Sequence, residues 1–235
     1  MRSFFKSWGV SCEFLFVQKG RNEKTFQNRQ RFSIGVNENF NLRKKIGLFF
    51  GTFDPIHNGH IELAEYFLNC TDLEKIFLIV TPLNPFKDDA LIVDNKHRFQ
   101  MVINATAGKS KFYPSDIEFK IPVPNHTIKT ILKIKKEYPN VSFTLLMGED
   151  NLSLFDKWKE YKSILENLDV YVYPRVVEYS IPVVLENHPK IKKFEAPLIN
   201  VSSTEIRNRI KQNEEVKELV PSKVFNYIKE KKLYM

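Results

Sequence analysis

The sequence predicts a doubly wound α/β fold: a mainly parallel sheet with helices on both faces. Short apolar runs of strand length alternate with helical patterns from residue 46 onward. One such run, residues 46–50, passes through a glycine turn into a helix start, the local layout of a nucleotide site. Three residues that follow strands, Gly51, Thr81 and Gly148, would share the sheet edge at which such folds bind ligands.

The expected strands are taken in chain order. Residues 46–50 (IGLFF) and 76–80 (IFLIV) are continuous apolar runs, typical of strands buried on both faces. Residues 116–121 are expected to form a third strand. Residues 141–147 form the next central strand, and residues 168–173 another.

The expected helices lie between and after these strands. The first begins near Asn58 and continues through the helical pattern IELAEYFL. Residues 97–107 form the second. Residues 127–138 form an amphipathic third helix, and residues 203–211 and 222–231 close the chain. The solvent side of the third helix is expected to carry Lys129, Lys133, Lys135 and Lys136.

Length and composition fit one sizeable packed domain. The chain has 235 residues, of which 43% are hydrophobic and 13% aromatic. Two cysteines, Cys12 and Cys70, give no disulfide framework and fit a reducing compartment. No apolar run approaches the ~20 residues of a membrane-spanning helix, so no membrane partner is expected. We expect a cytoplasmic protein, and the sequence leaves its oligomeric state open, a homo-oligomer included.

The net charge of +8 is concentrated near the N-terminus. Residues 1–44 contain nine Lys or Arg against three Glu, which accounts for six of the eight charges. Residues 45–235 are therefore nearly neutral, and no nucleic-acid partner is expected. We interpret residues 1–44 as a basic extension that is disordered or lies upstream of the true start, near residues 39–45. An organelle transit peptide is an alternative.

The segment from Gly51 to His60 reads GTFDPIHNGH and carries the strongest functional signal. His57 and His60 stand where a strand passes into a helix N-terminus, a place that favours phosphates. They could instead be zinc ligands, but no Cys, Asp or Glu stands nearby at ligand spacing. They could also be ordinary polar residues of a turn.

This segment resembles the G-x-F-D-P-x-H-x-G-H signature of Rossmann-like nucleotidyltransferases, relatives of class I aminoacyl-tRNA synthetases. Three later blocks, at residues 145–152 (LLMGEDNL), 155–159 (FDKWK) and 201–207 (VSSTEIR), resemble motifs of bacterial nicotinate-nucleotide adenylyltransferases. The four blocks occur in the family's order and cover roughly residues 45–235. The segments FFGTF and NPFK are similar to the corresponding segments of Bacteroidetes members of the family.

The resemblance implies roles for individual residues. His57 would contact the β- and γ-phosphates of ATP together with Mg²⁺, and His60 would stabilise the charge at the α-phosphate. No metal ligand from a protein side chain is expected. The implied ATP-binding residues are Gly51, Thr52, Phe53, His57, His60, Gly148, Asp150, Ser203, Thr204 and Arg207. Residues 202–207 also read as a plain helix start with a hydroxyl N-cap, and both interpretations can hold.

Two further cations are candidates for phosphate binding. Lys87 follows a strand and a proline-punctuated loop, with a solvated loop lysine as the alternative; Phe86 replaces the usual histidine before it. Arg98 matches a family arginine that opens a helix, with a surface salt bridge as the alternative.

The pyridine nucleotide would contact Thr127, Trp158 and Arg175, with Trp158 stacking on the ring. Core packing is the alternative for Trp158. Two departures from the family pattern, Phe50 for a glycine and His126 for a tyrosine, alter the expected contacts.

The implied reaction is transfer of AMP from ATP, with Mg²⁺, to nicotinate mononucleotide, giving deamido-NAD⁺ and pyrophosphate. Nicotinamide mononucleotide as the preferred substrate and phosphopantetheine adenylyl transfer are alternatives within the fold. A nucleotide-binding regulator without catalysis is an alternative of a different class, and an RNA-binding module driven by the basic N-terminus ranks last.

Overall fold

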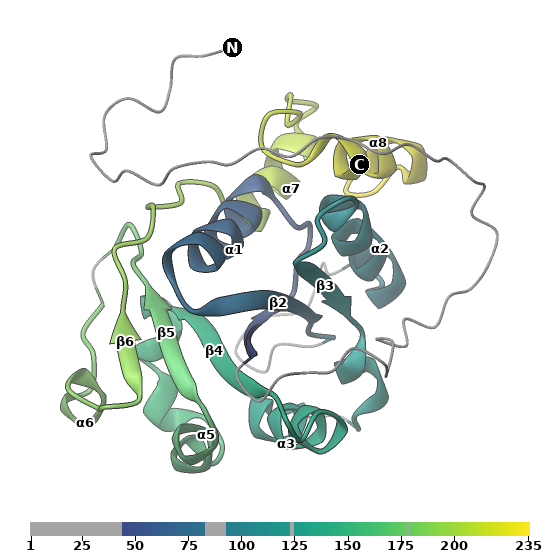
Figure 1. The fold of residues 1–235 in the computed structure, drawn as a ribbon. Helices are drawn as coiled ribbons and strands as arrows, with labels where there is room; N and C mark the ends of the chain where they lie inside the picture. The colour runs from purple at the N-terminus through teal and green to yellow at the C-terminus, as the bar shows by residue number, and fades with distance from the viewer. Residues whose placement is uncertain (1–43, 83–92, 123–124, 178) are drawn as a thin grey trace. The chain divides into compact units, whose positions relative to one another are not determined.

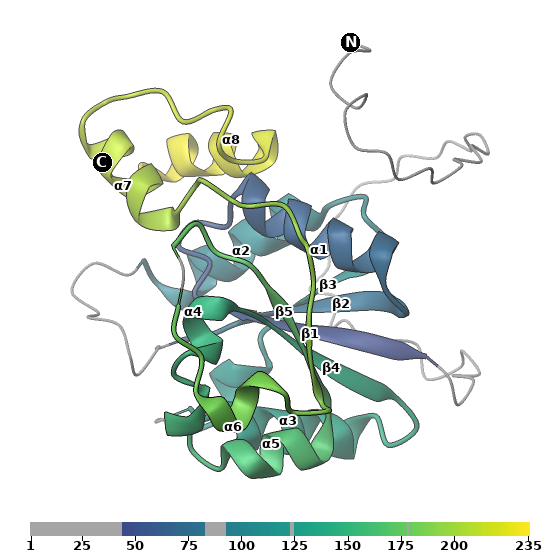
Figure 2. The ribbon, with the colours of Figure 1, turned by 90° about the vertical axis from the view of Figure 1, so that its left-hand side faces the viewer.

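The described part of the chain is built around a six-stranded sheet, in which every neighbouring pair of strands runs parallel. The computed structural model describes residues 44–82, 93–122, 125–177 and 179–235. The strand order is β3-β2-β1-β4-β5-β6 (Figures 1 and 2). The strands are β1 (Lys45–Gly51), β2 (Leu73–Val80), β3 (Phe112–Ser115), β4 (Ser142–Gly148), β5 (Asp169–Tyr173) and β6 (Ile191–Lys193).

Helices cover both faces of this sheet, so the predicted doubly wound fold is confirmed (Figure 2). One face carries α1 (Asn58–Cys70), α2 (Asn95–Thr106), α7 (Ser203–Lys211) and α8 (Ser222–Lys231). The other carries α3 (Thr127–Glu137), α5 (Tyr161–Asn167) and α6 (Val183–Glu186). A single turn, α4 (Glu149–Leu152), follows β4. Among the described helices, none combines the length and the apolar character needed to cross a bilayer.

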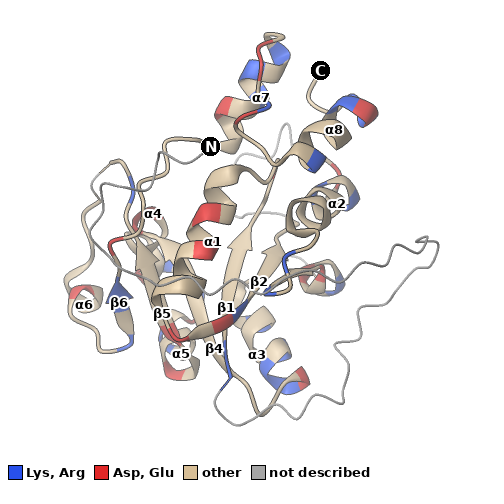
Figure 3. Cartoon of the chain, turned by 45° about the horizontal axis from the view of Figure 1, so that its top comes forward, with Lys and Arg blue, Asp and Glu red and all other residues tan. Residues whose placement is uncertain are grey.

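The strand interiors are apolar because they are covered from both sides. Leu48, Ile76, Leu78 and Val170 are fully buried. The predicted amphipathic helix is confirmed as α3: its isoleucines are buried, whereas Lys129 and Lys136 are exposed and Lys133 and Lys135 are partly exposed. Figure 3 colours the Lys positions of this helix blue. Hydrophobic burial on both sheet faces thus fixes which residues of each element point inward.

The strand order places a topological switch point between β1 and β4. From β1 the chain proceeds outward through β2 and β3, then returns to the opposite side of β1 to form β4. Parallel strands that diverge in this way leave a crevice at their carboxyl ends. Gly51 ends β1 and Gly148 ends β4, so both predicted glycines lie at this crevice.

One predicted strand is wrong. Residues 116–121 do not form a strand: β3 ends at Ser115, and Ile117–Lys120 form a 3₁₀ helix, η1. The sequence there alternates polar and apolar residues, but both Ile117 and Glu118 are buried. The Glu118 carboxyl accepts a hydrogen bond from Thr130 of α3, and the Asn125 side chain donates to the Glu118 carbonyl. These polar contacts outweigh the local strand pattern.

Other features were not predicted or lie outside the described residues. The edge strand β6 has only three residues and two of them are exposed lysines, so it has no apolar run. Residues 1–43, which make up nearly all of the predicted N-terminal extension, lie outside the described residues, and so do Phe86 and Lys87.

Candidate active site

The loop between β1 and α1 presents the two histidines side by side. His57 is the N-cap of α1 and His60 lies one turn into the helix. Their rings are 3.7 Å apart between centroids, with an angle of 30° between the planes. A spacing of three residues places side chains on the same face of a helix, so the pairing follows from sequence. The predicted location at a strand-to-helix junction is confirmed.

His60 is held in one orientation by backbone and aromatic contacts. The backbone N–H of His57 donates to Nδ1 of His60 at 3.2 Å. A neutral imidazole that accepts at Nδ1 carries its proton on Nε2, and Nε2 is then the donor. The ring of Phe53 packs against it edge-on, with centroids 5.0 Å apart. The Phe53 side chain is buried and supports His60, and the expected contact of Phe53 with ATP stays a prediction.

His57 is almost fully buried, with 4% of its surface exposed. Burial, followed by the positive charge of Arg175, lowers the pKa of His57 to about 4. Its Nδ1 atom has no hydrogen-bond partner among the described residues. Near neutral pH this imidazole is therefore uncharged, and a phosphate group beside it would favour its protonated form.

The glycine between the histidines packs α1 against the chain that leads into α7. A β-carbon on Gly59 would overlap Cγ2 of Ile199 and approach Cγ1 of Val201 within 3.2 Å. Only glycine allows this close approach, and it brings the start of α7 to the histidine loop.

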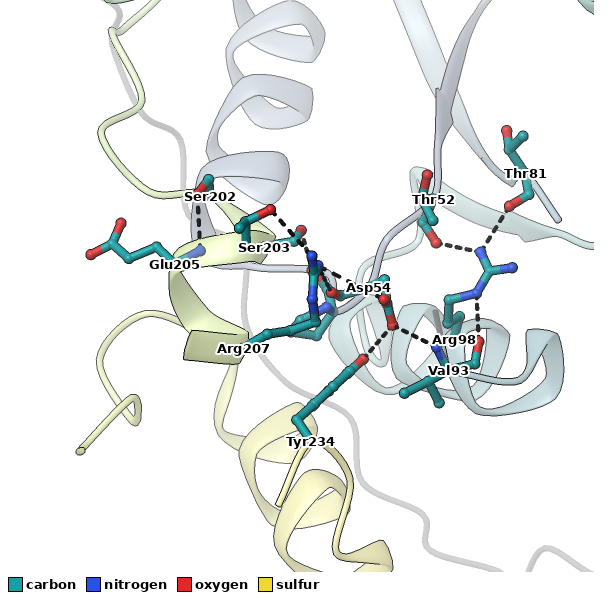
Figure 4. A network of polar contacts seen from close by, with 12 residues as sticks. Thr52, Asp54, Thr81, Val93, Arg98, Ser202, Ser203, Glu205, Arg207 and Tyr234 are labelled. Atoms are coloured by element: carbon teal, nitrogen blue, oxygen red, sulfur yellow. Dashed lines mark hydrogen bonds and ion pairs between the residues drawn. The ribbon is translucent and has the colours of Figure 1, made fainter. Parts of the chain in front are cut away.

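The start of α7 is tied to the histidine loop by two hydrogen bonds, and a third within the helix orients Arg207 (Figure 4). The Ser203 hydroxyl donates to the Pro55 carbonyl at 2.9 Å. Arg207 donates to the Asp54 carbonyl at 2.8 Å and to the Thr204 hydroxyl at 3.2 Å. The arrangement brings Ser203, Thr204 and Arg207 close to the histidine loop, as a shared phosphate site would require.

The predicted hydroxyl N-cap of this helix is also confirmed. The Ser202 side chain accepts a hydrogen bond from the backbone N–H of Glu205 at 3.1 Å, as Figure 4 shows. The capping interpretation therefore holds for Ser202, whereas Ser203 and Thr204 use their hydroxyls in contacts beyond the cap.

A pocket of about 280 Å³ opens at the carboxyl ends of the central strands. It is lined by Gly51, which ends β1, by Thr52 and by Thr81, which follows β2. Trp158 and Thr127, both predicted to contact the pyridine nucleotide, line it together. The remaining lining residues are Phe50, Glu118, Asn125, His126, Leu145, Leu146, Met147, Asn151, Lys157, Lys159 and Tyr173.

Trp158 is half-buried and is not a plain core residue. Its ring contacts Phe155 edge-on, with centroids 5.3 Å apart, and Phe155 is fully buried. Phe155 thus fixes the orientation of an indole that also faces the pocket. A rigid aromatic face of this kind suits a planar heterocycle.

The pocket also contains two buried acceptors that were not predicted. Glu118 is 2% exposed and its Oε2 atom has no hydrogen-bond partner among the described residues. The same holds for Oδ1 of buried Asn125. Burial raises the pKa of Glu118, although hydroxyl groups of Thr130 and Thr81 act in the opposite direction. No motif marked either residue, and Glu118 lies in the segment predicted as a strand.

Asp150 and Arg175, predicted to contact the nucleotide, bind each other. Nε and Nη2 of Arg175 donate to the two carboxylate oxygens of Asp150 at 2.9 and 3.0 Å. The guanidinium also lies over the ring of Tyr173, 5.3 Å from its centroid. A β-carbon on Gly148 would overlap this pair, since it would come within 2.8 Å of Nε of Arg175. The glycine is therefore needed for the ion pair to lie against β4.

The prediction that Arg98 contacts phosphate is wrong, and so is the alternative of a surface salt bridge. Arg98 is fully buried, with 0% of its surface exposed. Its guanidinium donates five hydrogen bonds, to the carbonyls of Thr52, Thr81, Pro82 and Val93 and to the side chain of Asn95. A guanidinium has five N–H donors, so these bonds use all of them. Arg98 instead ties the ends of β1 and β2 to α2 (Figure 4).

The zinc interpretation of the histidine pair gains no support. In the described ranges, no three His, Cys, Asp or Glu side chains gather in a way that could hold a metal ion. Lys87, the other predicted phosphate contact, lies outside the described residues and remains a prediction.

Comparison with known proteins identifies the family. Residues 48–209 match the family model described as cytidylyltransferase-like. A protein of Flavobacterium johnsoniae named "Probable nicotinate-nucleotide adenylyltransferase" is 47% identical over 190 residues, which cover 81% of this chain and 98% of that protein. A protein of Christiangramia forsetii with the same name is 45% identical over 193 residues, covering 82% of this chain and 100% of its own length.

A solved structure shares the fold. It is titled "Plasmodium falciparum nicotinic acid mononucleotide adenylyltransferase complexed with NaAD" and is 22% identical to this chain. The TM-score is 0.67, and the match covers 81% of this chain and 97% of the other. The sequence identities above and the family model together show that the chain belongs to the nicotinate-nucleotide adenylyltransferase family, within the cytidylyltransferase-like proteins.

Proposed function

We propose that this protein transfers AMP from ATP to nicotinate mononucleotide, giving deamido-NAD⁺ and pyrophosphate. One observation carries the proposal: the paired His57 and His60 begin α1 just after β1, and the end of β1, at Gly51, lines a pocket of about 280 Å³ that Trp158 and Thr127 also line. A phosphate-binding element and an aromatic slot thus adjoin at the switch point, where folds of this type bind nucleotides. The names of the relatives support the same reaction.

The chemistry requires positioning more than proton transfer. A phosphate oxygen of the mononucleotide attacks the α-phosphorus of ATP, a new P–O–P bond forms, and the bond to pyrophosphate breaks. Because the second pKa of a phosphomonoester is ~6, the attacking group is already mostly dianionic near neutral pH. The site therefore has to align two anions and neutralise the charge that develops.

His60 is proposed to act on the α-phosphate. Its Nδ1 accepts the His57 backbone N–H, so Nε2 is the atom that donates to a phosphate oxygen. The Phe53 ring and the His57 ring both pack against the imidazole, so little reorganisation is needed when charge develops.

The leaving pyrophosphate is proposed to lie between His57 and the start of α7. Arg207 and Thr204 are already oriented there by hydrogen bonds, and Ser203 anchors the helix start to the loop. Mg²⁺ is proposed to arrive with ATP, held by phosphate oxygens. Its contribution is to neutralise phosphate charge.

The mononucleotide is proposed to enter the pocket with its pyridine ring against Trp158. Thr127 begins α3 beside that ring, where the backbone N–H groups of a helix start favour a carboxylate. The cytoplasm is the proposed compartment, since both substrates are soluble metabolites and the chain carries few cysteines.

The test is pyrophosphate release with ATP and Mg²⁺, offering nicotinate mononucleotide, nicotinamide mononucleotide and phosphopantetheine separately. Turnover with a clear preference for the nicotinate form is expected. A preference for the amide would overturn the substrate but keep the histidine chemistry. Absence of turnover with all three, from a folded protein that binds ATP, would favour a regulator.

Two variants link the activity to the site. His60→Ala is expected to lower kcat by about 10²-fold or more, because removing one donor to a developing oxyanion typically costs that much. His188→Ala is the matched control, since His188 lies after α6, outside the pocket and the histidine loop. Full turnover of His60→Ala would refute the assigned role.

A further inference from the structure

Asp54, within the histidine loop, is a buried carboxylate to which the proposed reaction assigns no task. It is 3% exposed and stands three residues before His57. A buried carboxylate is costly unless hydrogen-bond donors surround it. The donors that reach Asp54 therefore indicate what holds the loop in place.

The best of these donors comes from the segment after α8. The Tyr234 hydroxyl donates to Oδ1 of Asp54 at 2.7 Å, across 180 residues of sequence. The backbone N–H of Val93 reaches the same oxygen at 3.4 Å, a weak contact. Oδ2 lies 3.8 Å from Nη1 of Arg207, an ion pair beyond hydrogen-bond distance. Among the described residues, Tyr234 thus supplies the short hydrogen bond to this carboxylate (Figure 4).

The backbone after α8 turns so that the Tyr234 hydroxyl reaches Asp54. After α8 the backbone passes twice through the left-handed region, at Lys232 (φ 50°) and at Tyr234 (φ 66°). Leu233, between them, is buried against the core. The Tyr234 phenol therefore points back toward Asp54 in the histidine loop. Burial, together with the negative charge of Asp54, raises the pKa of Tyr234, so the hydroxyl stays protonated and acts as a donor.

Asp54 passes this restraint to the phosphate site. Its carbonyl accepts from Arg207 at 2.8 Å, and its carboxylate faces the same guanidinium. The residue before it, Phe53, supports the His60 ring. The next residue, Pro55, accepts the Ser203 hydroxyl. Asp54 thus lies between His60, which is proposed to act on the α-phosphate, and the α7 residues that are proposed to bind the triphosphate.

We propose that Tyr234 is a positioning residue for ATP: through Asp54 it fixes Arg207 and the histidine loop in the geometry that receives the triphosphate. The inference rests on the proposed function. Neither Tyr234, Asp54 nor Arg207 lines the mononucleotide pocket, so the effect is specific to ATP.

The test compares Tyr234→Phe with Tyr227→Phe, a matched control within α8. Tyr227 also makes one phenol hydrogen bond, to Nδ1 of His97 at 2.9 Å, but that bond does not touch the loop. For Tyr234→Phe we expect the KM for ATP to rise about fivefold or more, with the KM for nicotinate mononucleotide within about twofold of wild type. For Tyr227→Phe both constants should stay within about twofold.

A double-mutant cycle tests the route through Asp54. Asp54→Asn is expected to weaken ATP binding, and adding Tyr234→Phe should then cost less than it does in the wild type. Independent, multiplying effects would overturn the proposal, and so would an unchanged KM for ATP in Tyr234→Phe.

Calorimetric titration of ATP separates this inference from the proposed reaction. If the wild type proves inactive yet Tyr234→Phe binds ATP at least about fivefold more weakly, the reaction fails but the positioning role stands. If the wild type is active and both tyrosine variants lose only thermal stability, with ATP binding unchanged, Tyr234 is structural and the inference is refuted.

Discussion

The depressed pKa of His57 predicts a specific loss of stability in mild acid. The pKa is about 4 in the folded protein, against 6.5 for an ordinary histidine. Below pH 6.5 the unfolded chain therefore binds a proton that the folded chain does not bind. Stability contributed by the neutral imidazole is fully present above pH 6.5 and is lost as the pH falls toward 4.

The size of this loss follows from the difference between the two pKa values. It corresponds to about 3 kcal/mol of unfolding free energy between pH 7 and pH 4. Because His57 is 4% exposed, solvent screening reduces this value little. Carboxylates with lowered pKa values, such as Asp72 and Asp169, also lose stability in acid, so the comparison needs a variant that lacks only the histidine.

The assay is urea unfolding of the wild type and of His57→Gln at pH 7, 6, 5 and 4. Between pH 7 and pH 4, we expect the unfolding free energy of the wild type to fall by about 3 kcal/mol more than that of His57→Gln. The unfolding free energy of His188→Gln should follow that of the wild type. An NMR titration of the His57 ring measures its pKa directly, and we expect a value near 4 in the free protein. Bound ATP should raise this pKa. A free-protein pKa near 6.5, or parallel pH curves for wild type and His57→Gln, would refute the reasoning.

Three further predictions concern the remaining site. Arg98→Met should lower the unfolding free energy by at least ~3 kcal/mol in urea titration, since it leaves several buried carbonyls without donors; a stable variant with weaker ATP binding would restore the phosphate role. Trp158→Ala should raise the KM for the mononucleotide about tenfold while leaving the KM for ATP within about twofold, because stacking contributes ~1–3 kcal/mol; equal changes in both would contradict this. Gly148→Ala should weaken ATP binding in calorimetry by pushing Arg175 from Asp150, and unchanged binding would remove that pair from the ATP site.

Local sequence determined the features that neighbouring residues can fix among themselves. The continuous apolar run of β1 is enough to predict a buried strand. The spacing of three residues between His57 and His60 places their rings together once α1 forms. Ser202 caps α7 because the acceptor and the N–H that it binds lie three residues apart. The family motifs added the expected chemistry at these positions.

Only the tertiary structure decided the outcomes that depend on partners far away in sequence. Arg98 could not be placed from its own helix, because the carbonyls that bind it belong to the ends of β1 and β2. Glu118 joins the pocket only because Thr130 and Asn125 draw a strand-like segment into a 3₁₀ turn. Tyr234 meets Asp54 after 180 residues. A sequence pattern records how a residue suits its own strand or helix, but burial and hydrogen bonding are settled by whichever distant group the fold brings to it.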